Sequence, residues 1–207
     1  MTDRREVLGY VQSGGWSTRF GDDKALAVLG GSTMLARTSQ IVATACGDAR
    51  IVAAQDKYSS APVQVVADKW PGQGPLGGIL TALFDAKERS GENTAALIVS
   101  CDMPFLTAEW LRFMAERALQ SDAEAVVPKS TQGWEPLCAC WRTTAVEMIL
   151  PLFEAGTRKV TDALNVLHVD VLDEKDWKRF DTNGRLFWNM NTVADYEEAR
   201  RALAAEK

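Results

Sequence analysis

The segment Val7-Leu-Gly-Tyr-Val-Gln-Ser-Gly-Gly-Trp-Ser-Thr-Arg-Phe-Gly-Asp-Asp-Lys24 joins a short apolar run directly to a glycine-rich stretch. The apolar run Val7–Gln12 predicts a β-strand, and residues 14–24 predict a loop. Further along the chain, short runs rich in Val and Ile alternate with longer segments of helical period, which is typical of βαβ units. The sequence therefore predicts an α/β fold built around a mostly parallel sheet.

The remaining elements are predicted from the period of the apolar positions and from turn and cap residues. Further strands are expected at residues 50–54, 63–67, 95–101, 124–127, 137–142, 166–172 and 187–190. Helices are expected at residues 33–45, 107–119, 144–153 and 192–204, and from the Pro/Gly cluster at 71–78 through residue 87. Ser32 and Gly47 are the expected ends of the first helix, and Thr107 is the expected N-cap of the helix that it begins. Thr192 and Asp195 are spaced like a capping box.

The composition is that of an ordinary globular chain, and one domain over residues 1–207 is expected. A net charge of −5 argues against a general affinity for nucleic acid or an anionic membrane, because such binding needs a basic surface. No run of roughly 18 apolar residues is available for a transmembrane helix, and Val7–Val11 is too short for the core of a signal peptide. The four cysteines form no C-x-x-C pair, which is typical of reduced thiols packed in a core. The cytoplasm is the expected compartment.

The glycine-rich loop suits an anionic ligand. Gly14 and Gly15 can adopt positive φ and turn backbone N–H groups toward phosphate oxygens, while Arg19 and Lys24 add positive charge. The loop is neither a Walker A sequence nor a dinucleotide-binding G-x-G-x-x-G. The alternative for the same residues is a tight strand exit with two solvated basic side chains.

Asp102 follows the uninterrupted apolar run at residues 95–101, which is typical of a strand buried on both faces. Open α/β sheets bind ligands at the carboxyl ends of their strands. A lone carboxylate there suits Mg²⁺, which completes its coordination shell with phosphates and water. The alternative is a turn residue that caps a helix.

Other polar segments have weaker signals. Asp68 ends an apolar run before Gly74-Pro-Leu-Gly-Gly78, where glycines let the backbone lie close to a flat ligand. Gly156–Lys159 and Asn189–Thr192 are polar segments that suit a second substrate. Taken singly, these segments are a turn, a helix entry and a loop. The single histidine, His168, lies in a predicted strand, so no histidine-based catalytic triad can be built.

Taken together, these motifs resemble those of the molybdenum cofactor guanylyltransferase family in order and spacing, over nearly the whole chain. That family's opening signature reads L-A-G-G-x-S-x-R-M-G-x-x-K, and it is followed by G-P-L-A-G, C-D-x-P and N-x-N-T segments. This sequence departs from the pattern at Gln12, Ser13 and Phe20, and it has Gly77 where alanine is usual. In relatives the first two positions of the signature lie against the base, so Gln12 bears on the base preference.

The resemblance implies a three-layer, Rossmann-like nucleotide-diphospho-sugar transferase fold with helices on both faces of the sheet. It implies the transfer of GMP from Mg-GTP to molybdopterin, giving molybdopterin guanine dinucleotide and pyrophosphate, with Mg²⁺ as the cofactor. The residues that it assigns to catalysis are Arg19, Lys24 and Asp102, of which Asp102 is also the Mg²⁺ ligand. The residues assigned to the nucleotide are Gln12, Ser13, Gly14, Gly15, Lys24, Asp68, Gly77, Gly78 and Asp102. The residues assigned to the acceptor are Arg158, Lys159, Asn189 and Asn191.

The expected partners are therefore GTP and molybdopterin, with no nucleic acid and no membrane. Transient contact with molybdenum cofactor biosynthesis proteins or molybdoenzyme chaperones is expected, and the chain is expected to be a monomer or a weak oligomer. Two alternatives remain open at this stage. One is a related nucleotidyltransferase that uses CTP with the same pterin or a sugar-phosphate acceptor. The other is a nucleotide-binding protein without turnover.

Overall fold

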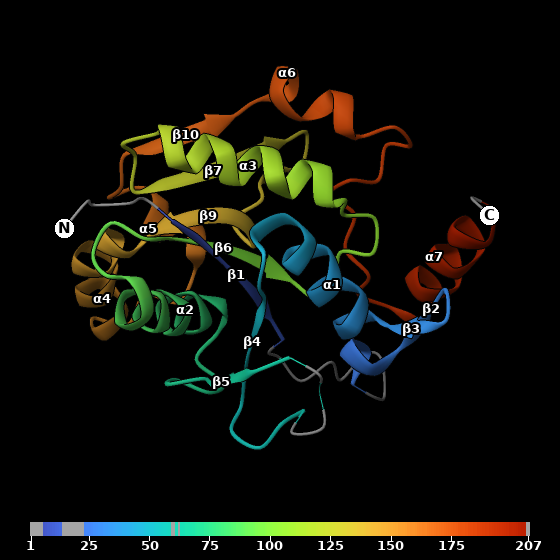
Figure 1. Ribbon diagram of the computed structural model, residues 1–207, viewed down its shortest axis with the longest axis horizontal. Coiled ribbons are helices and arrows are strands. Elements are labelled where there is room, and N and C mark those ends of the chain that lie inside the picture. The colour runs from blue at the N-terminus through green and yellow to red at the C-terminus, as the bar shows by residue number, and fades with distance from the viewer. Residues whose placement is uncertain (1–5, 14–22, 59–60, 62, 206–207) are drawn as a thin grey trace.

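A computed structural model describes residues 6–13, 23–58, 61 and 63–205 (Figure 1). Its central sheet has eight strands, seven of them in the order β10-β7-β9-β6-β1-β4-β5, and β8 pairs with β7. The strands of this sheet are β1 (Val7–Gln12), β4 (Arg50–Ala53), β5 (Val65–Ala67), β6 (Ala95–Ser100), β7 (Ala125–Ser130), β8 (Gly133–Trp134), β9 (Cys138–Arg142) and β10 (Val169–Leu172).

Strand β1 lies at the centre of the sheet and is parallel to both of its neighbours. Tyr10 is paired with Ile98 of β6 on one side and with Arg50 of β4 on the other. Strands β4 and β5 are also parallel, as are β7 and β10. Strand β9 is antiparallel to both β6 and β7. The sheet is therefore mixed but mostly parallel, as the sequence predicts, and the carboxyl ends of β1, β4 and β6 meet at one edge.

Helices cover both faces of the sheet, as predicted. Helices α1 (Met34–Cys46) and α3 (Ala108–Gln120) pack on one face, where Val11 and Val99 join their buried residues. Helices α2 (Pro75–Ser90), α4 (Val146–Glu154) and α5 (Val160–Leu164) pack on the other face. Successive strand residues point to opposite faces, so each central strand supplies both cores.

A third, smaller core lies at one end of the molecule (Figure 1). It joins α7 (Val193–Ala205) to the short hairpin of β2 (Val28–Leu29) and β3 (Ser32–Thr33). The Tyr196 hydroxyl donates to the backbone oxygen of Val28 at 2.9 Å, which fixes the helix to the hairpin. This contact brings the last helix back to the segment that follows Lys24.

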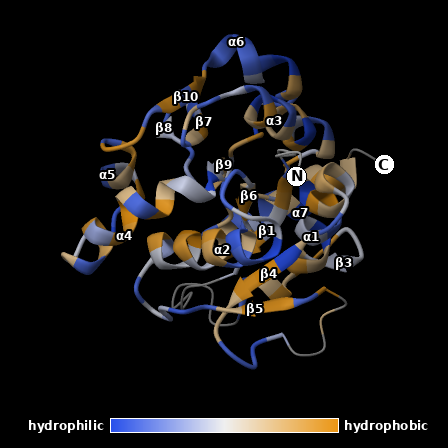
Figure 2. Ribbon diagram, turned by 60° about the vertical axis from the view of Figure 1, so that its left-hand side comes forward, coloured by the Kyte–Doolittle hydropathy of each residue, from blue (hydrophilic) through white to orange (hydrophobic). Residues whose placement is uncertain are grey.

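The hydropathy of the elements differs between the sheet and the surface. Strands β4 and β5 are hydrophobic, whereas α6 (Glu174–Trp177) is largely hydrophilic (Figure 2). Over the described residues, none of the helices has the length and apolar character needed to cross a membrane. The described cysteines carry free thiols, and Cys101, Cys138 and Cys140 are buried, which agrees with the core packing expected for them.

Two local predictions were wrong. Thr33, not Ser32, is the N-cap of α1, because the Thr33 side chain accepts from the backbone N–H of Ala36 at 3.2 Å. Residues 187–190 form no strand: the first of them belong to a turn, in which the N–H of Trp188 donates to the oxygen of Arg185 at 2.9 Å. The short elements β2, β3, β8, α5 and α6, of two to five residues each, were not predicted.

Candidate active site

The carboxyl ends of β1 and β6 form the base of the site. Gln12 and Ser100 are paired in register, and the N–H of Cys101 donates to the oxygen of Gln12 at 3.2 Å. Asp102 follows directly, and its Oδ1 accepts from the hydroxyl of Ser100 at 2.6 Å. The predicted carboxylate therefore stands at the sheet edge where α/β proteins bind ligands.

Lys24 meets Asp102 at this edge. Its ammonium group pairs with Oδ2 of Asp102, and the two side chains are 20% and 13% exposed. Lys24 begins a short 3₁₀ turn over Lys24–Leu26, which Asp23 caps by accepting from the N–H of Ala25 at 3.2 Å. Because the turn fixes the backbone of Lys24, its ammonium reaches a carboxylate 78 positions further along the chain.

A polar cluster that the sequence did not predict lies beside this pair. The hydroxyl of Tyr58 donates to Oδ2 of Asp23 at 2.6 Å and lies 2.8 Å from the hydroxyl of Ser13. The ammonium of Lys57 lies 3.0 Å from the same Asp23 oxygen. Tyr58 belongs to no recognisable sequence motif, so no signal in the sequence could have identified it.

The environment of this cluster sets its charges. Burial, and then the hydrogen bond to Asp23, raise the pKa of Tyr58 to about 12. Burial alone would raise the pKa of Asp23, but the hydrogen bonds from Tyr58 and Lys57 outweigh it and lower that pKa below 3.8. At neutral pH the phenol is protonated and the carboxylate is charged, so the donor and the acceptor are both defined.

Asp68 lies just beyond the end of β5 and is held in place by the protein. Its N–H donates to the oxygen of Ala53 at 2.7 Å. Its Oδ1 accepts from the N–H of Trp70 and from the hydroxyl of Thr81, both at 3.0 Å. Asp68 is therefore fixed to both β4 and α2, while its role toward a nucleotide stays a prediction.

The Gln12 side chain lies against the start of α2. Its Nε2 donates to the oxygen of Pro75 at 3.0 Å, and among the described residues its buried Oε1 has no hydrogen-bond partner. A Cβ at position 78 would lie 2.2 Å from Gln12 Nε2, and one at position 77 would lie 3.2 Å from Cβ of Trp70. Gly78 therefore leaves room for Gln12, and Gly77 lies close to Trp70. Contact of either glycine with a base stays a prediction.

The two segments predicted for the acceptor lie in different places: one beside the Lys24–Asp102 pair and the other near the start of α2. The N–H of Met190, between Asn189 and Asn191, donates to the oxygen of Asp102 at 2.8 Å, so the Asn-x-Asn segment borders the Lys24–Asp102 pair. Arg158 lies instead near the start of α2, where its Nε donates to Oε1 of Gln73 at 2.9 Å.

The side chains of these acceptor candidates differ in their freedom. The Asn189 amide donates to the oxygen of Phe187 at 3.1 Å, and Asn191 is exposed. The guanidinium of Arg158 lies over the ring of Phe153 at 4.2 Å and donates to that residue's oxygen at 2.6 Å. Lys159 is exposed at the N-terminus of α5. Gly14, Gly15 and Arg19, also predicted for the site, lie outside the described residues.

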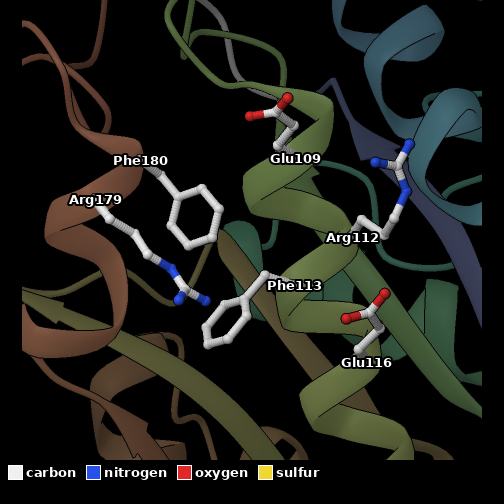
Figure 3. A pocket seen from close by; sticks show the side chains of 6 residues that line it. All are labelled: Glu109, Arg112, Phe113, Glu116, Arg179 and Phe180. Carbon is white, nitrogen blue, oxygen red and sulfur yellow. The ribbon is translucent and has the colours of Figure 1, made fainter.

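A shallow hollow of about 190 Å³ lies elsewhere on the surface, between α3 and the 3₁₀ turn Lys178–Phe180 (Figure 3). Arg179 lies over the rings of Phe113 and Phe180 at 4.8 Å from each centre. None of the residues predicted for nucleotide or acceptor lines this hollow. The sequence-predicted site and the hollow are therefore distinct.

The mostly parallel sheet, with a lysine and an aspartate paired at the carboxyl edge, is typical of α/β enzymes that bind phosphorylated nucleotides, and the class is nucleotidyltransferase. The sequence profile of the MobA-like NTP transferase domain matches residues 9–170. The chain belongs to this family.

Individual relatives agree with this assignment. The chain is 31% identical over 201 residues to the molybdenum cofactor guanylyltransferase of Desulfosudis oleivorans, and the alignment covers 96% of each chain. Its fold is similar to that of the molybdopterin-guanine dinucleotide biosynthesis protein A of Archaeoglobus fulgidus, with a TM-score of 0.82 at 23% identity, covering 96% of this chain and 99% of the other. A nucleotidyl transferase from Methanothermobacter has the same fold with a TM-score of 0.71 at 15% identity, covering 98% of this chain and 99% of the other.

Proposed function

We propose that this protein transfers the GMP group of Mg-GTP to the terminal phosphate of molybdopterin, giving molybdopterin guanine dinucleotide and pyrophosphate. The names of its relatives support the substrates. The Lys24–Asp102 pair at the carboxyl edge of β1 and β6 is the structural observation that carries the proposal. It places one cation and one carboxylate where a triphosphate with its metal would lie.

The reaction needs little covalent chemistry from the protein. An oxygen of the acceptor phosphate attacks the α-phosphorus of GTP, and the bond from that phosphorus to the bridging oxygen of the β-phosphate breaks, so that pyrophosphate leaves. A phosphomonoester has a second pKa of about 6, so the acceptor is largely dianionic near neutral pH and needs no general base. Positioning the two phosphates in line and neutralising the leaving group are the tasks left to the protein.

Each of the predicted site residues has a role in this scheme. Lys24 and Arg19 neutralise the leaving pyrophosphate, and backbone N–H groups of residues 12–15 approach the base and phosphates. Asp68 and the glycines at 77 and 78 contact the nucleotide. The acceptor side consists of Asn189 and Asn191 near Asp102, with Arg158 and Lys159 near the acceptor phosphate.

The residues present fit Mg²⁺. Asp102 offers carboxylate oxygens, which are the ligands that Mg²⁺ prefers, and its Oδ2 pairs with Lys24, which in this proposal turns to the phosphates when the nucleotide binds. Among the described residues, no three His, Cys, Asp or Glu side chains gather to hold a metal. A Mg²⁺ bound by Asp102 would therefore take its other ligands from phosphates and water. When bound, Mg²⁺ neutralises charge on the phosphates during transfer.

We also propose that residues 1–207 act as one unit in the cytoplasm. The sheet draws on strands from β1 to β10, and α7 returns to the hairpin that follows Lys24, which supports a single unit. The buried free thiols support a reducing compartment. Contacts with other cofactor-biosynthesis proteins would be transient, and the chain would be a monomer or a weak oligomer.

Pyrophosphate release tests the proposal. The protein is incubated with Mg²⁺, molybdopterin and either GTP, CTP or ATP, and pyrophosphate is measured over time. Release with GTP alone is expected. Release with CTP in its place would favour the cytidylyl alternative and make Gln12 the first residue to examine for base preference. Nucleotide binding without release from any triphosphate would contradict the enzyme and favour a binding protein.

A further inference from the structure

One phenol joins the two ends of the glycine-rich segment. Ser13 ends the described part of the chain before this segment, and Asp23 begins the part that follows it. The hydroxyl of Tyr58 lies 2.8 Å from the hydroxyl of Ser13 and 2.6 Å from Oδ2 of Asp23. A single oxygen atom therefore fixes the distance between the end of β1 and the turn that carries Lys24.

The direction of these hydrogen bonds is determined by their chemistry. A carboxylate only accepts, so Tyr58 must donate its one proton to Asp23. Ser13 must then donate to Tyr58, which leaves the Ser13 oxygen to accept from the thiol of Cys101 at 3.6 Å. The chain of donors begins beside Asp102 and ends on the carboxylate of Asp23. It joins the ends of β1 and β6, which the sheet already pairs, to Asp23, which lies outside the sheet.

The backbone around Tyr58 is shaped for this contact. Tyr58 and Asp56 have φ of 61° and 63°, a left-handed conformation that non-glycine residues seldom adopt. Residues in such conformations persist where their surroundings hold them, and they cluster at functional sites. Here Lys57 also pairs with Asp23 at 3.0 Å and lies over the Tyr58 ring at 4.9 Å. The side chains of Lys57 and Tyr58 thus both hold the loop after β4 against Asp23.

We infer that Tyr58 is a positioning residue for nucleotide binding, which sets Ser13 and Lys24 at the spacing that the triphosphate of GTP requires. This inference rests on the proposed function. In this role Tyr58 acts on Lys24 through Asp23, whose side chain caps the Lys24–Leu26 turn. Its loss should therefore weaken the binding of the nucleotide and leave the acceptor unaffected.

The test compares Tyr58→Phe with Tyr10→Phe. Both substitutions remove a phenol oxygen that donates to an aspartate, since the hydroxyl of Tyr10 donates to Oδ2 of Asp85 at 2.7 Å, although Tyr10 is fully buried and Tyr58 is half-buried. Tyr10 packs among the residues of α2 and is not part of the site. The two variants therefore match in chemistry and differ in place.

For each variant, the Kd of Mg-GTP is measured by calorimetry, and the KM of GTP, the KM of molybdopterin and the Tm are measured beside it. Tyr58→Phe is expected to raise the Kd and the KM of GTP about tenfold or more, the size expected for a hydrogen bond to a charged group. It should leave the KM of molybdopterin within about twofold, and Tyr10→Phe should leave all three constants within about twofold. Tyr58→Phe should raise the Kd of Mg-GTP by a smaller factor in an Asp23→Asn background than in the wild type, because the two residues act through one hydrogen bond.

The outcomes separate the two proposals. If the wild-type protein binds Mg-GTP and releases pyrophosphate but Tyr58→Phe behaves like Tyr10→Phe, the function stands and the positioning role is wrong. A lower Tm for Tyr58→Phe with an unchanged Kd would also overturn that role, since it would show a purely structural contribution. If the wild-type protein neither binds Mg-GTP nor releases pyrophosphate, both proposals fall.

Discussion

At the scale of single residues, the charge of Asp102 is the feature on which the proposed reaction depends most directly. Asp102→Asn keeps the shape of the side chain and its contact with Ser100 but removes the charge that pairs with Lys24 and binds Mg²⁺. Turnover at saturating Mg²⁺ and GTP is expected to fall about 100-fold, the size typical of losing one electrostatic contact to the transition state. Steady-state pyrophosphate release measures it, with Asp170→Asn on β10 as the control. Normal turnover by Asp102→Asn would contradict the metal assignment.

Gly78 makes a prediction about packing. Gly78→Ala would place a Cβ only 2.2 Å from Nε2 of Gln12. The Gln12 side chain must then shift and give up its hydrogen bond to the oxygen of Pro75. A cost of about 1–3 kcal/mol in the free energy of unfolding is expected. Gly77→Ala is the control, and it should cost less, because its Cβ meets Trp70 at 3.2 Å. Urea denaturation measures both variants.

The clash at position 78 has a direct check. In a Gln12→Ala background the long side chain is absent, so Gly78→Ala should cost less than half of what it costs in the wild type. An equal cost in both backgrounds would show that the backbone of α2, and not Gln12, requires glycine at this position.

At the scale of elements, Arg142 of β9 anchors the end of α3. Its buried guanidinium donates to backbone oxygens of four residues at 2.6–3.3 Å, and these are Asn93, Ala118, Ser121 and Ala123. A cation at the C-terminus of a helix is also favoured by the helix dipole. The antiparallel strand β9 thus holds the helix whose other end is capped by Thr107, as the sequence predicted.

Arg142→Met should lower the free energy of unfolding by about 3 kcal/mol or more, because it leaves buried backbone oxygens without their donor. Arg117→Met, on helix α3, should lower the free energy of unfolding by about 1 kcal/mol at most, since Arg117 pairs with Asp170 at the exposed surface. Denaturant titration of both variants measures the difference. Equal costs would contradict the anchoring role of Arg142.

The elements themselves were largely predictable, and the reason is their period. The long apolar run of β6 and the amphipathic helices α1 and α3 gave clear signals, and their ends lie within two residues of the predicted ends. The failure at residues 187–190 has a physical cause. Met190 is buried, and Phe187 and Trp188 are partly buried, by packing against α3 and the small third core and not by pairing in a sheet. The sequence alone cannot distinguish the two kinds of packing.

At the scale of the whole molecule, three of the described carboxylates make the free energy of unfolding depend on pH. The pKa of Asp170 is lowered by its hydrogen bond to Arg117. The pKa of Asp23 and that of Asp195 are lowered because hydrogen bonds outweigh burial. Each binds its proton more weakly in the folded chain, so its contribution is complete above the ordinary value of 3.8 and is lost as the pH falls through the lowered value. Glu135, whose pKa is raised by burial, works in the opposite direction.

The free energy of unfolding should therefore fall as the pH drops below about 4. Asp170→Asn should reduce this dependence, because one of the three groups no longer titrates. Urea titrations at pH 7 and at pH 3 measure the change for the wild type and the variant. An identical pH dependence in both would contradict the assignment to Asp170.

The site was predictable where the chain order places residues at the ends of neighbouring strands. Asp102 follows β6, and the glycine-rich segment that ends at Lys24 follows β1, so the parallel pairing of these strands predicts both residues at the same edge of the sheet. The approach of the Asn189–Asn191 segment to Asp102 depends on one backbone hydrogen bond from Met190, and Tyr58 reaches Ser13 by an unusual backbone conformation. Neither contact follows from local periodicity, so only the folded structure reveals them.

The transfer of labelled phosphate tests the central claim most directly. GTP labelled with ³²P at the α-phosphate or at the γ-phosphate is incubated with the protein, Mg²⁺ and molybdopterin, and the pterin product is separated and counted. The α-label is expected in the pterin dinucleotide and the γ-label in pyrophosphate alone. Absence of α-label from the pterin, with wild-type protein that binds Mg-GTP, would contradict guanylyl transfer.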